Sequence, residues 1–285
     1  MSPLGVIGGS GLYQMAGLED TREERVETPF GDPSDVYLLG RLGECQVAFL
    51  ARHGRAHRLL PTEINFRANI HGFKALGVER IVSISAVGSM KEDLRPLDVV
   101  LPDQFIDWTH KRPSTFFGSG VVAHVSLADP VCPVLKEALA EAAVLCGARL
   151  HRDGVYLCIE GPQFSTRAES RLYRSFGVDV IGMTNVQEAK LAREAEICYA
   201  TVAMVTDYDS WRVGEAPVTV DEVVARLRDN ARTAQTILAG ATGLLPASRT
   251  CPCASALDHA ILTDRAAIPR EARERLRPLA GGRLG

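Results

Sequence analysis

Three short segments of the chain combine glycines, hydroxyl groups and cationic side chains in the way that anion-binding loops do. Residues 8–12 read Gly-Gly-Ser-Gly-Leu, where backbone N–H groups can approach an anion closely and the hydroxyl of Ser10 adds a donor. Residues 52–57 read Arg-His-Gly-Arg-Ala-His, and the planar fork of an arginine matches a phosphate group. Residues 83–89 again bring small residues and hydroxyls together. The three segments together predict one anion site of phosphate size.

Each of these segments also has a simpler interpretation when it is taken alone. Residues 8–12 lack both the third glycine of the dinucleotide-binding fingerprint and the lysine of the Walker loop, so a tight turn explains them equally well. Residues 52–57 could form a solvated basic turn. His53 and His57 could also ligate a metal ion, although no acidic residue lies in register with them.

Two later segments suit an organic ligand. Residues 160–162 predict a rigid turn, and Phe164 beside it could stack on a flat ring or belong to the core. Asp207 and Asp209 follow an apolar run, where two carboxylates suit general acid chemistry or the recognition of N–H groups. Aspartates in this spacing also form ordinary turns.

All of these segments lie at or just after apolar runs that predict β-strands. The predicted strands cover residues 4–7, 46–51, 80–85, 98–101, 155–159, 178–181 and 199–206. Their near-continuous hydrophobicity is typical of strands that are covered on both faces. Helical spacing of apolar residues separates them, at residues 66–73, 135–143, 168–176 and 219–238. This alternation predicts an α/β fold, a single domain whose central mixed sheet is flanked by helices and binds ligands beyond its strand ends.

Length and charge exclude several functional classes. The chain has 285 residues, of which 46% are hydrophobic, enough for a sizeable core. A formal net charge of −3 gives no reason to expect nucleic acid or an anionic membrane as a partner. The chain contains no long uncharged apolar run and no signal-peptide pattern at its start. We therefore expect a cytoplasmic protein. The arginine-rich end after Thr263 predicts a solvated helix and a loose tail.

Cysteine spacing separates two groups among the seven cysteines. Five are scattered and are expected to be buried, reduced thiols. Cys251 and Cys253 form a Cys-x-Cys pair with no second cysteine pair nearby in the sequence, so no zinc site is expected. They are a candidate for a strained disulfide or a redox pair, with two free thiols as the alternative.

The order of the motifs resembles the trimeric purine nucleoside phosphorylases. The likeness rests on residues 8–12, 52–55 and 160–164, on residues 167–170, and on the Met183-Thr184 pair, and it runs from about Val6 to Leu238. Residues 206–209, Thr-Asp-Tyr-Asp, are similar to the methylthioadenosine phosphorylase branch of this family, because branches that act on 6-oxopurines carry Asn in place of Asp207. A carboxyl group can accept a hydrogen bond from the 6-amino group of adenine and, when protonated, can donate one to N7.

The resemblance implies a role for each part of the site. Phosphate would be bound by Ser10, Arg52, His53, Ser85, Ala86 and Thr184. The nucleoside would be bound by Phe164, Ser165, Met183, Asp207, Asp209, Val220, Val223, Val224, His57 and His124. In the family the valine positions line the pocket of the 5′-methylthio group, and a neighbouring subunit contributes the residue at His124. The implied assembly is a homotrimer or a dimer of trimers.

The implied activity is the phosphorolysis of 5′-methylthioadenosine to adenine and 5-methylthioribose 1-phosphate, a pentosyltransferase step of purine and methionine salvage. Asp207 would donate a proton toward N7, which requires a raised pKa, and Asp209 would orient or share that proton. Inorganic phosphate is a co-substrate, and no metal or organic cofactor is required. Residues 1–245 would form the catalytic domain, and residues 246–285 a helix and tail appended to it.

Some positions depart from the family pattern. Gly182 stands where the animal enzymes have Asn, Asn185 and Gln187 replace Thr and Pro, and Ser85 replaces the usual Thr. These departures keep open a phosphorylase for 6-oxopurine nucleosides (inosine, guanosine or methylthioinosine) or for 5′-deoxyadenosine-type nucleosides. A nucleoside hydrolase and a non-catalytic nucleoside-binding module are the alternatives from other classes. The Cys-x-Cys segment is similar to the tail of some archaeal and bacterial members.

Overall fold

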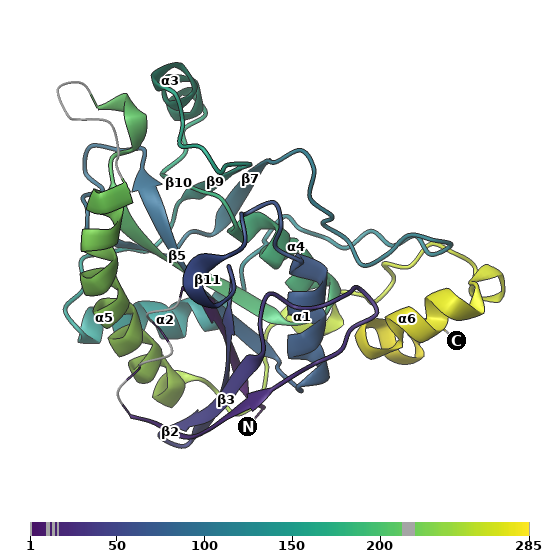
Figure 1. The fold of residues 1–285 in the computed structure, drawn as a ribbon. Coiled ribbons are helices and arrows are strands. Elements are labelled where there is room, and N and C mark those ends of the chain that lie inside the picture. The colour runs from purple at the N-terminus through teal and green to yellow at the C-terminus, as the bar shows by residue number, and fades with distance from the viewer. Residues whose placement is uncertain (1, 10–11, 13–14, 16, 213–219, 285) are drawn as a thin grey trace.

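A computed structural model describes residues 2–9, 12, 15, 17–212 and 220–284, and of residues 220–225 and 227 it describes the backbone only. In the described part of the chain, one mixed sheet lies between two layers of helices, which confirms the predicted fold class (Figure 1). The strands are β1 (Leu4–Gly8), β2 (Leu18–Glu24), β3 (Tyr37–Leu42), β4 (Cys45–Ala51), β5 (Arg80–Ser89), β6 (Val99–Val100), β7 (Gln104–Trp108), β8 (Leu150–His151), β9 (Val155–Ile159), β10 (Val180–Gly182) and β11 (Cys198–Asp207). The α-helices are α1 (Phe66–Ala75), α2 (Pro133–Leu145), α3 (Arg167–Ser175), α4 (Asn185–Glu194), α5 (Val220–Leu244) and α6 (Arg270–Ala280).

Strand β5 is the centre of the sheet. It pairs in parallel with β1 on one side and with β11 on the other, and its last residues pair in antiparallel fashion with β10. The sheet continues in the order β2-β3-β4-β1-β5-β10-β9-β7, while β11 also pairs with β6, which pairs with β8. Because β4, β1 and β5 are parallel neighbours, the segments that follow or end them meet at one edge of the sheet.

The two faces of the sheet are covered by different helices. Helices α2 and α5 pack on one face and contribute Leu139 and Ile237 to its apolar cluster. On the other face α1 and α4 contribute Phe73 and Leu191, and α6 joins them (Figure 1). This double coverage explains why the central strands are apolar along their whole length.

All seven predicted strands are present, with shifted ends in several cases. The prediction missed β2, whose side chains are mostly exposed, and also β3, β7 and β8. It also missed α4, because Gln187 and Glu188 lie at buried positions of that helix and interrupt the apolar stripe. The predicted cap of α5 at Thr219 lies outside the described residues.

The expectation of a loose C-terminal tail is wrong. Helix α6 buries Ala272, Leu276 and Leu279 against the cluster that includes α1, and Leu284 near the end of the chain is also buried. The many arginines lie around the narrow apolar stripe of α6 and mask it in the sequence. The boundary between residues 245 and 246 stays a prediction. None of the helices in the described ranges is long and apolar enough to span a bilayer.

Truncation of Leu276 tests whether α6 is part of the core. Leu276 is fully buried, so Leu276→Ala should lower the free energy of unfolding by about 2–5 kcal/mol in chemical denaturation. The matched control is Leu262→Ala, because Leu262 is 67% exposed, and it should cost less than about 0.5 kcal/mol. Equal, small losses for both variants would contradict the docking of α6.

Candidate active site

Arg52, the first residue after β4, is buried at the edge where β4, β1 and β5 meet. Its backbone N–H donates to the carbonyl of Gly8 at 3.1 Å. Its side chain donates from Nε to Oε1 of Glu188 at 2.6 Å, from Nη1 to the Ile84 carbonyl at 2.9 Å and from Nη2 to Oγ of Ser83 at 2.6 Å. Although burial lowers it, attraction to Glu188 leaves the pKa of Arg52 raised, so the group stays cationic.

Glu188 on α4 collects several of these hydrogen bonds. Its Oε2 accepts from Oγ of Ser83 at 2.7 Å and from the hydroxyl of Tyr199 at 2.9 Å. Asn185 continues the network, because its Nδ2 donates to Ser83 at 3.2 Å and to Oγ1 of Thr201 at 2.7 Å. The ends of β4 and α4 are therefore joined to the middle of β5 and β11 by buried polar side chains, which the sequence analysis did not foresee.

The ion pair leaves only part of Arg52 for a ligand. A second bond from Nη2 to Glu188 brings the engaged N–H groups to four of the five that a guanidinium carries. One Nη1 hydrogen has no partner among the described residues. Arg52 can thus offer a single hydrogen bond and its charge to a phosphate, rather than a bidentate fork. Its role as a phosphate ligand stays a prediction.

His53 is neutral at physiological pH. Burial lowers its pKa to about 4, and its Nδ1 lies 2.9 Å from the carbonyl of Leu59. A neutral ring that donates from Nδ1 keeps a lone pair on Nε2. The exposed ring of His57 stacks on it at 4.3 Å between centroids. Nε2 of His53 can therefore accept a hydrogen bond from a protonated phosphate oxygen, but the neutral ring adds no positive charge to the site.

The other predicted phosphate residues lie near the same network. Ser85 is two residues beyond Ser83 on β5, and Ala86 beside it is exposed although most of β5 is buried. Thr184 is the N-cap of α4, and its side chain does not cap the helix. A helix N-terminus carries partial positive charge, which favours an anion. The structure thus brings Arg52, Ser85, Ala86 and Thr184 around one network, while Ser10 lies outside the described residues.

Gly182, the departure from the animal pattern, makes room for a tyrosine. A Cβ atom at Gly182 would come 1.9 Å from the hydroxyl of Tyr156, so the ring of Tyr156 fills that space. The same hydroxyl lies 3.3 Å from Oγ of Ser85. Tyr156 therefore occupies the volume of a side chain at position 182 and holds a predicted phosphate ligand.

Arg112 joins the predicted ribose and purine segments, and no sequence signal pointed to it. Its buried guanidinium donates to the carbonyls of Met183 and Glu160 and, at 3.3 Å, to Oε1 of Gln187. Met183 also packs against the turn, because a Cβ at Gly161 would come 2.5 Å from its Sδ. One buried cation thereby holds two loops that come from distant parts of the chain.

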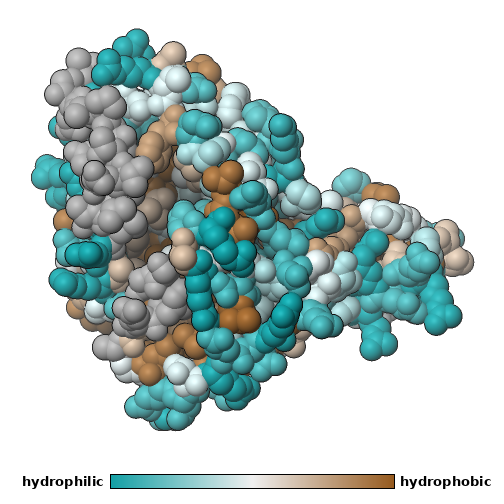
Figure 2. All heavy atoms as spheres, in the orientation of Figure 1, coloured by the Kyte–Doolittle hydropathy of each residue, from teal (hydrophilic) through white to brown (hydrophobic). Residues whose placement is uncertain are grey.

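Phe164 and Ser165 follow that turn. The ring of Phe164 is 44% exposed, which leaves it free to stack on a ligand. Ser165 is buried, and its hydroxyl lies close enough to Asp209 to lower the pKa of that carboxyl group. Figure 2 shows hydrophobic side chains gathered in a hollow on the face of the molecule that it displays.

The two aspartates lie over the end of β5. A Cβ at Gly88 would come 3.0 Å from Oδ1 of Asp207 and 3.3 Å from Cβ of Asp209. Asp207 accepts hydrogen bonds from Oγ1 of Thr206 at 2.6 Å and from the backbone N–H of Asp209 at 2.8 Å. Asp209 accepts from Oγ of Ser170 on α3. Two predicted phosphate residues, Ser85 and Ala86, therefore lie on the same strand whose end the aspartates cover.

Burial raises the pKa of Asp209, and the neighbouring Asp207 charge adds to the rise against hydrogen bonds from Ser170 and Ser210. The proposed mechanism requires a raised pKa at Asp207, and the structure shows one at the neighbouring Asp209. For Asp207 it stays a prediction. Two neighbouring carboxyl groups can share one proton.

The remaining predicted residues fall into two groups. The backbone of Val220, Val223 and Val224 belongs to α5, but the structure does not describe their side chains. Helix α5 is held to β11 where Asn230 donates to the carbonyl of Val205 at 3.1 Å. His124 is exposed and lines a cavity of about 870 Å³, and among the described residues no other predicted site residue lines it.

Glu188→Gln tests the buried ion pair. The variant leaves the charge of Arg52 buried without a counterion, so it should lower the free energy of unfolding by about 3–5 kcal/mol. The control is Glu137→Gln, which breaks the exposed pair with Arg152 and should cost less than about 1 kcal/mol. Urea denaturation of both variants measures the difference. Similar costs would show that Arg52 does not depend on Glu188.

Several known proteins are similar to this chain over nearly its whole length. S-methyl-5′-thioadenosine phosphorylase of Koribacter versatilis (strain Ellin345) is 59% identical over 282 residues, which cover 99% of this chain and 97% of that protein. The protein of the same name from Geobacter sulfurreducens is 58% identical and covers 98% of both chains.

Solved structures extend the likeness to the fold. The crystal structure of a methylthioadenosine phosphorylase from an antarctic soil metagenomic library superposes with a TM-score of 0.93, at 50% identity and 98% coverage of both chains. That of Schistosoma mansoni in complex with adenine superposes with a TM-score of 0.81, at 36% identity and over 87% of this chain and 93% of that one. The family model described as the Phosphorylase superfamily matches residues 3–242. The chain belongs to the phosphorylase superfamily.

Proposed function

We propose that the protein catalyses the phosphorolysis of 5′-methylthioadenosine to adenine and 5-methylthioribose 1-phosphate. The observation that supports this proposal most directly is that two predicted phosphate ligands lie on β5 and two aspartates lie over its end. Ser85 and Ala86 lie beside the cationic network of Arg52, and Gly88 lies under Asp207 and Asp209. Relatives that share more than half of the residues carry this enzyme name.

The reaction forms a bond between a phosphate oxygen and the anomeric carbon while the bond from that carbon to purine N9 breaks. The electron pair of the broken bond stays on the purine, and a proton reaches N7. Arg52, Ser85 and Thr184 orient the phosphate, whose own charge stabilises the cationic sugar. Positioning of the two reactants supplies a large part of the acceleration.

Asp207 serves as the proton donor toward N7, and Asp209 supports it. Asp209 is held by Ser170 and donates its backbone N–H to Asp207, so the two carboxyl groups keep a fixed relation. The raised pKa of Asp209 suits a pair that shares one proton. Protonation of the leaving purine lowers the barrier to departure.

The departures from the family pattern do not favour another base. Gly182 accommodates Tyr156, Asn185 joins the buried network through Ser83, and Gln187 accepts from Arg112. Each substitution therefore has a partner within the protein, which explains it without a change of substrate. Asp207 in place of Asn remains the feature that distinguishes 6-amino from 6-oxo purines.

The exposed position of His124, away from the other predicted residues, supports a homotrimer or a dimer of trimers in which it reaches a neighbouring site. We expect the enzyme to act in the cytoplasm, in purine and methionine salvage, with neither a metal nor an organic cofactor in the reaction.

Asp207→Asn removes the proposed proton donor. We expect kcat/KM for 5′-methylthioadenosine to fall by about 10²-fold or more, the scale of general acid catalysis. Asp93→Asn, at an exposed aspartate, is the control and should retain activity. Unchanged phosphorolysis by the Asp207 variant would refute the assigned role.

Product analysis tests the reaction itself. The protein should convert 5′-methylthioadenosine to adenine and a sugar 1-phosphate only when inorganic phosphate is present, and it should convert inosine far more slowly. Release of the free sugar without phosphate would identify a hydrolase. Faster turnover of inosine would identify a 6-oxopurine enzyme, and binding without turnover would identify a binding module.

A further inference from the structure

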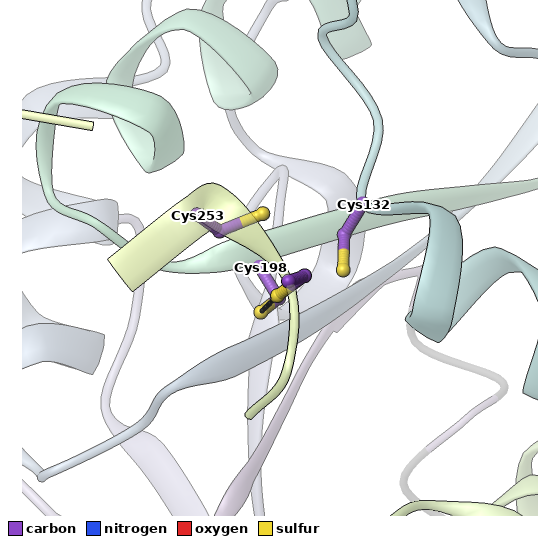
Figure 3. Close-up of side chains that lie close together, drawn as sticks. Cys132, Cys198 and Cys253 are labelled. Atoms are coloured by element: carbon purple, nitrogen blue, oxygen red, sulfur yellow. Dashed lines mark hydrogen bonds between the residues drawn. The ribbon is translucent and has the colours of Figure 1, made fainter. Parts of the chain in front are cut away.

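Four cysteines that are far apart in the sequence meet in space. The Sγ atoms of Cys132, Cys198, Cys251 and Cys253 all lie within 4.8 Å of one another. Figure 3 shows the labelled side chains of Cys132, Cys198 and Cys253 close together. We call these residues the four-cysteine cluster. In the sequence only the Cys-x-Cys pair stands out, because Cys132 and Cys198 are distant along the chain.

Three separate segments supply the cluster. Cys132 is the N-cap of α2, and Cys198 is the first residue of β11. Cys251 precedes the short 3-10 helix η4 (Pro252–Ser255), and Cys253 lies within it. Three of the four side chains are buried and Cys251 is half-buried. The surrounding residues belong to the apolar cluster under α2 and α5, and Cys253 also lines the cavity to which His124 belongs.

The spacing of the sulfur atoms suits one metal ion. Four thiolates bound to Zn²⁺ at about 2.3 Å in a tetrahedron lie roughly 3.8 Å apart. The sulfurs of Cys198 and Cys251 are 3.3 Å apart, and the whole set lies within 4.8 Å, so small shifts reach that geometry. We propose that the four-cysteine cluster is a tetrathiolate site for a single soft divalent cation, with Zn²⁺ as the ion whose chemistry fits best.

The surroundings offset the charge of such a site. Four thiols release four protons on binding Zn²⁺, which leaves a complex of charge −2. Arg80 on β5 is the register partner of Cys198 on β11. The N-terminus of α2, at Cys132, adds the positive end of a helix. Both features favour an anionic complex over neutral side chains.

The site has a structural role and is separate from the phosphorolysis. All four coordination positions are filled by cysteine, so none is open for a substrate. Cys198 begins β11, whereas Asp207 ends it. The ion joins the start of β11 and the start of α2 to the segment that leads toward α6, and it thereby anchors the C-terminal part of the chain.

Metal content is the direct test. Protein purified under reducing conditions, incubated with ZnCl₂ and freed of excess metal should hold about one zinc per chain in elemental analysis. Cys251→Ser and Cys132→Ser should lose most of it. Cys146→Ser, at a cysteine outside the cluster, is the matched control and should keep it. The wild-type protein loaded with Co²⁺ should show thiolate-to-cobalt charge-transfer absorption, which does not depend on whether a variant folds.

A thiol count separates the metal site from disulfides. With zinc bound, all seven cysteines should react after unfolding in the presence of a chelator. Each disulfide would remove two reactive thiols. Missing thiols that map to the cluster in protein purified without reductant, and zinc uptake far below one per chain under reducing conditions, would each overturn the proposal. So would zinc retained by both cluster variants, because it would then lie elsewhere.

Discussion

The buried ion pair of Arg52 and Glu188 is the contact on which the arrangement of the candidate active site depends. Two charges are removed from water here, at a cost that only close pairing and further hydrogen bonds can offset. Ser83 and Tyr199 supply those bonds from β5 and β11. The pair therefore fixes where β4 ends, where α4 begins and how β5 is oriented between them. The predicted phosphate ligands take their positions from this framework.

Strand β5 sets the distance between the predicted phosphate ligands and the two aspartates. Ser85 and Gly88 of β5 are three residues apart, and the aspartates lie over the second of them. A strand that is hydrogen-bonded on both sides cannot stretch or bend easily, so the separation between anion and base is a property of the sheet. Arg112 fixes the distance between two loops in a similar way, because it donates hydrogen bonds to the backbone carbonyls of Met183 and Glu160.

The sequence predicted the central strands and four of the helices well, because continuous apolar runs and helical periodicity are local signals. It failed at α4, where Glu188 is buried by its pairing with Arg52, a partner 136 residues away. Arg112 and the four-cysteine cluster were missed for the same reason. Their significance depends on which distant segments the fold brings together, whereas Arg52, Asp207 and the loops around them stand in recognisable local motifs.

Gly182 and Tyr156 carry a consequence for the evolution of the site. The tyrosine hydroxyl would lie 1.9 Å from any Cβ at position 182, so the two positions exclude one another sterically. A lineage that acquires a side chain at 182 must first, or at the same time, lose the ring at 156, and with it the contact to Ser85. A side chain at 182 would clash while Tyr156 is present, and loss of the ring would leave its volume empty while Gly182 is present. The residue types at positions 156 and 182 should therefore change together among descendants of this chain. Reversal would require two substitutions at once.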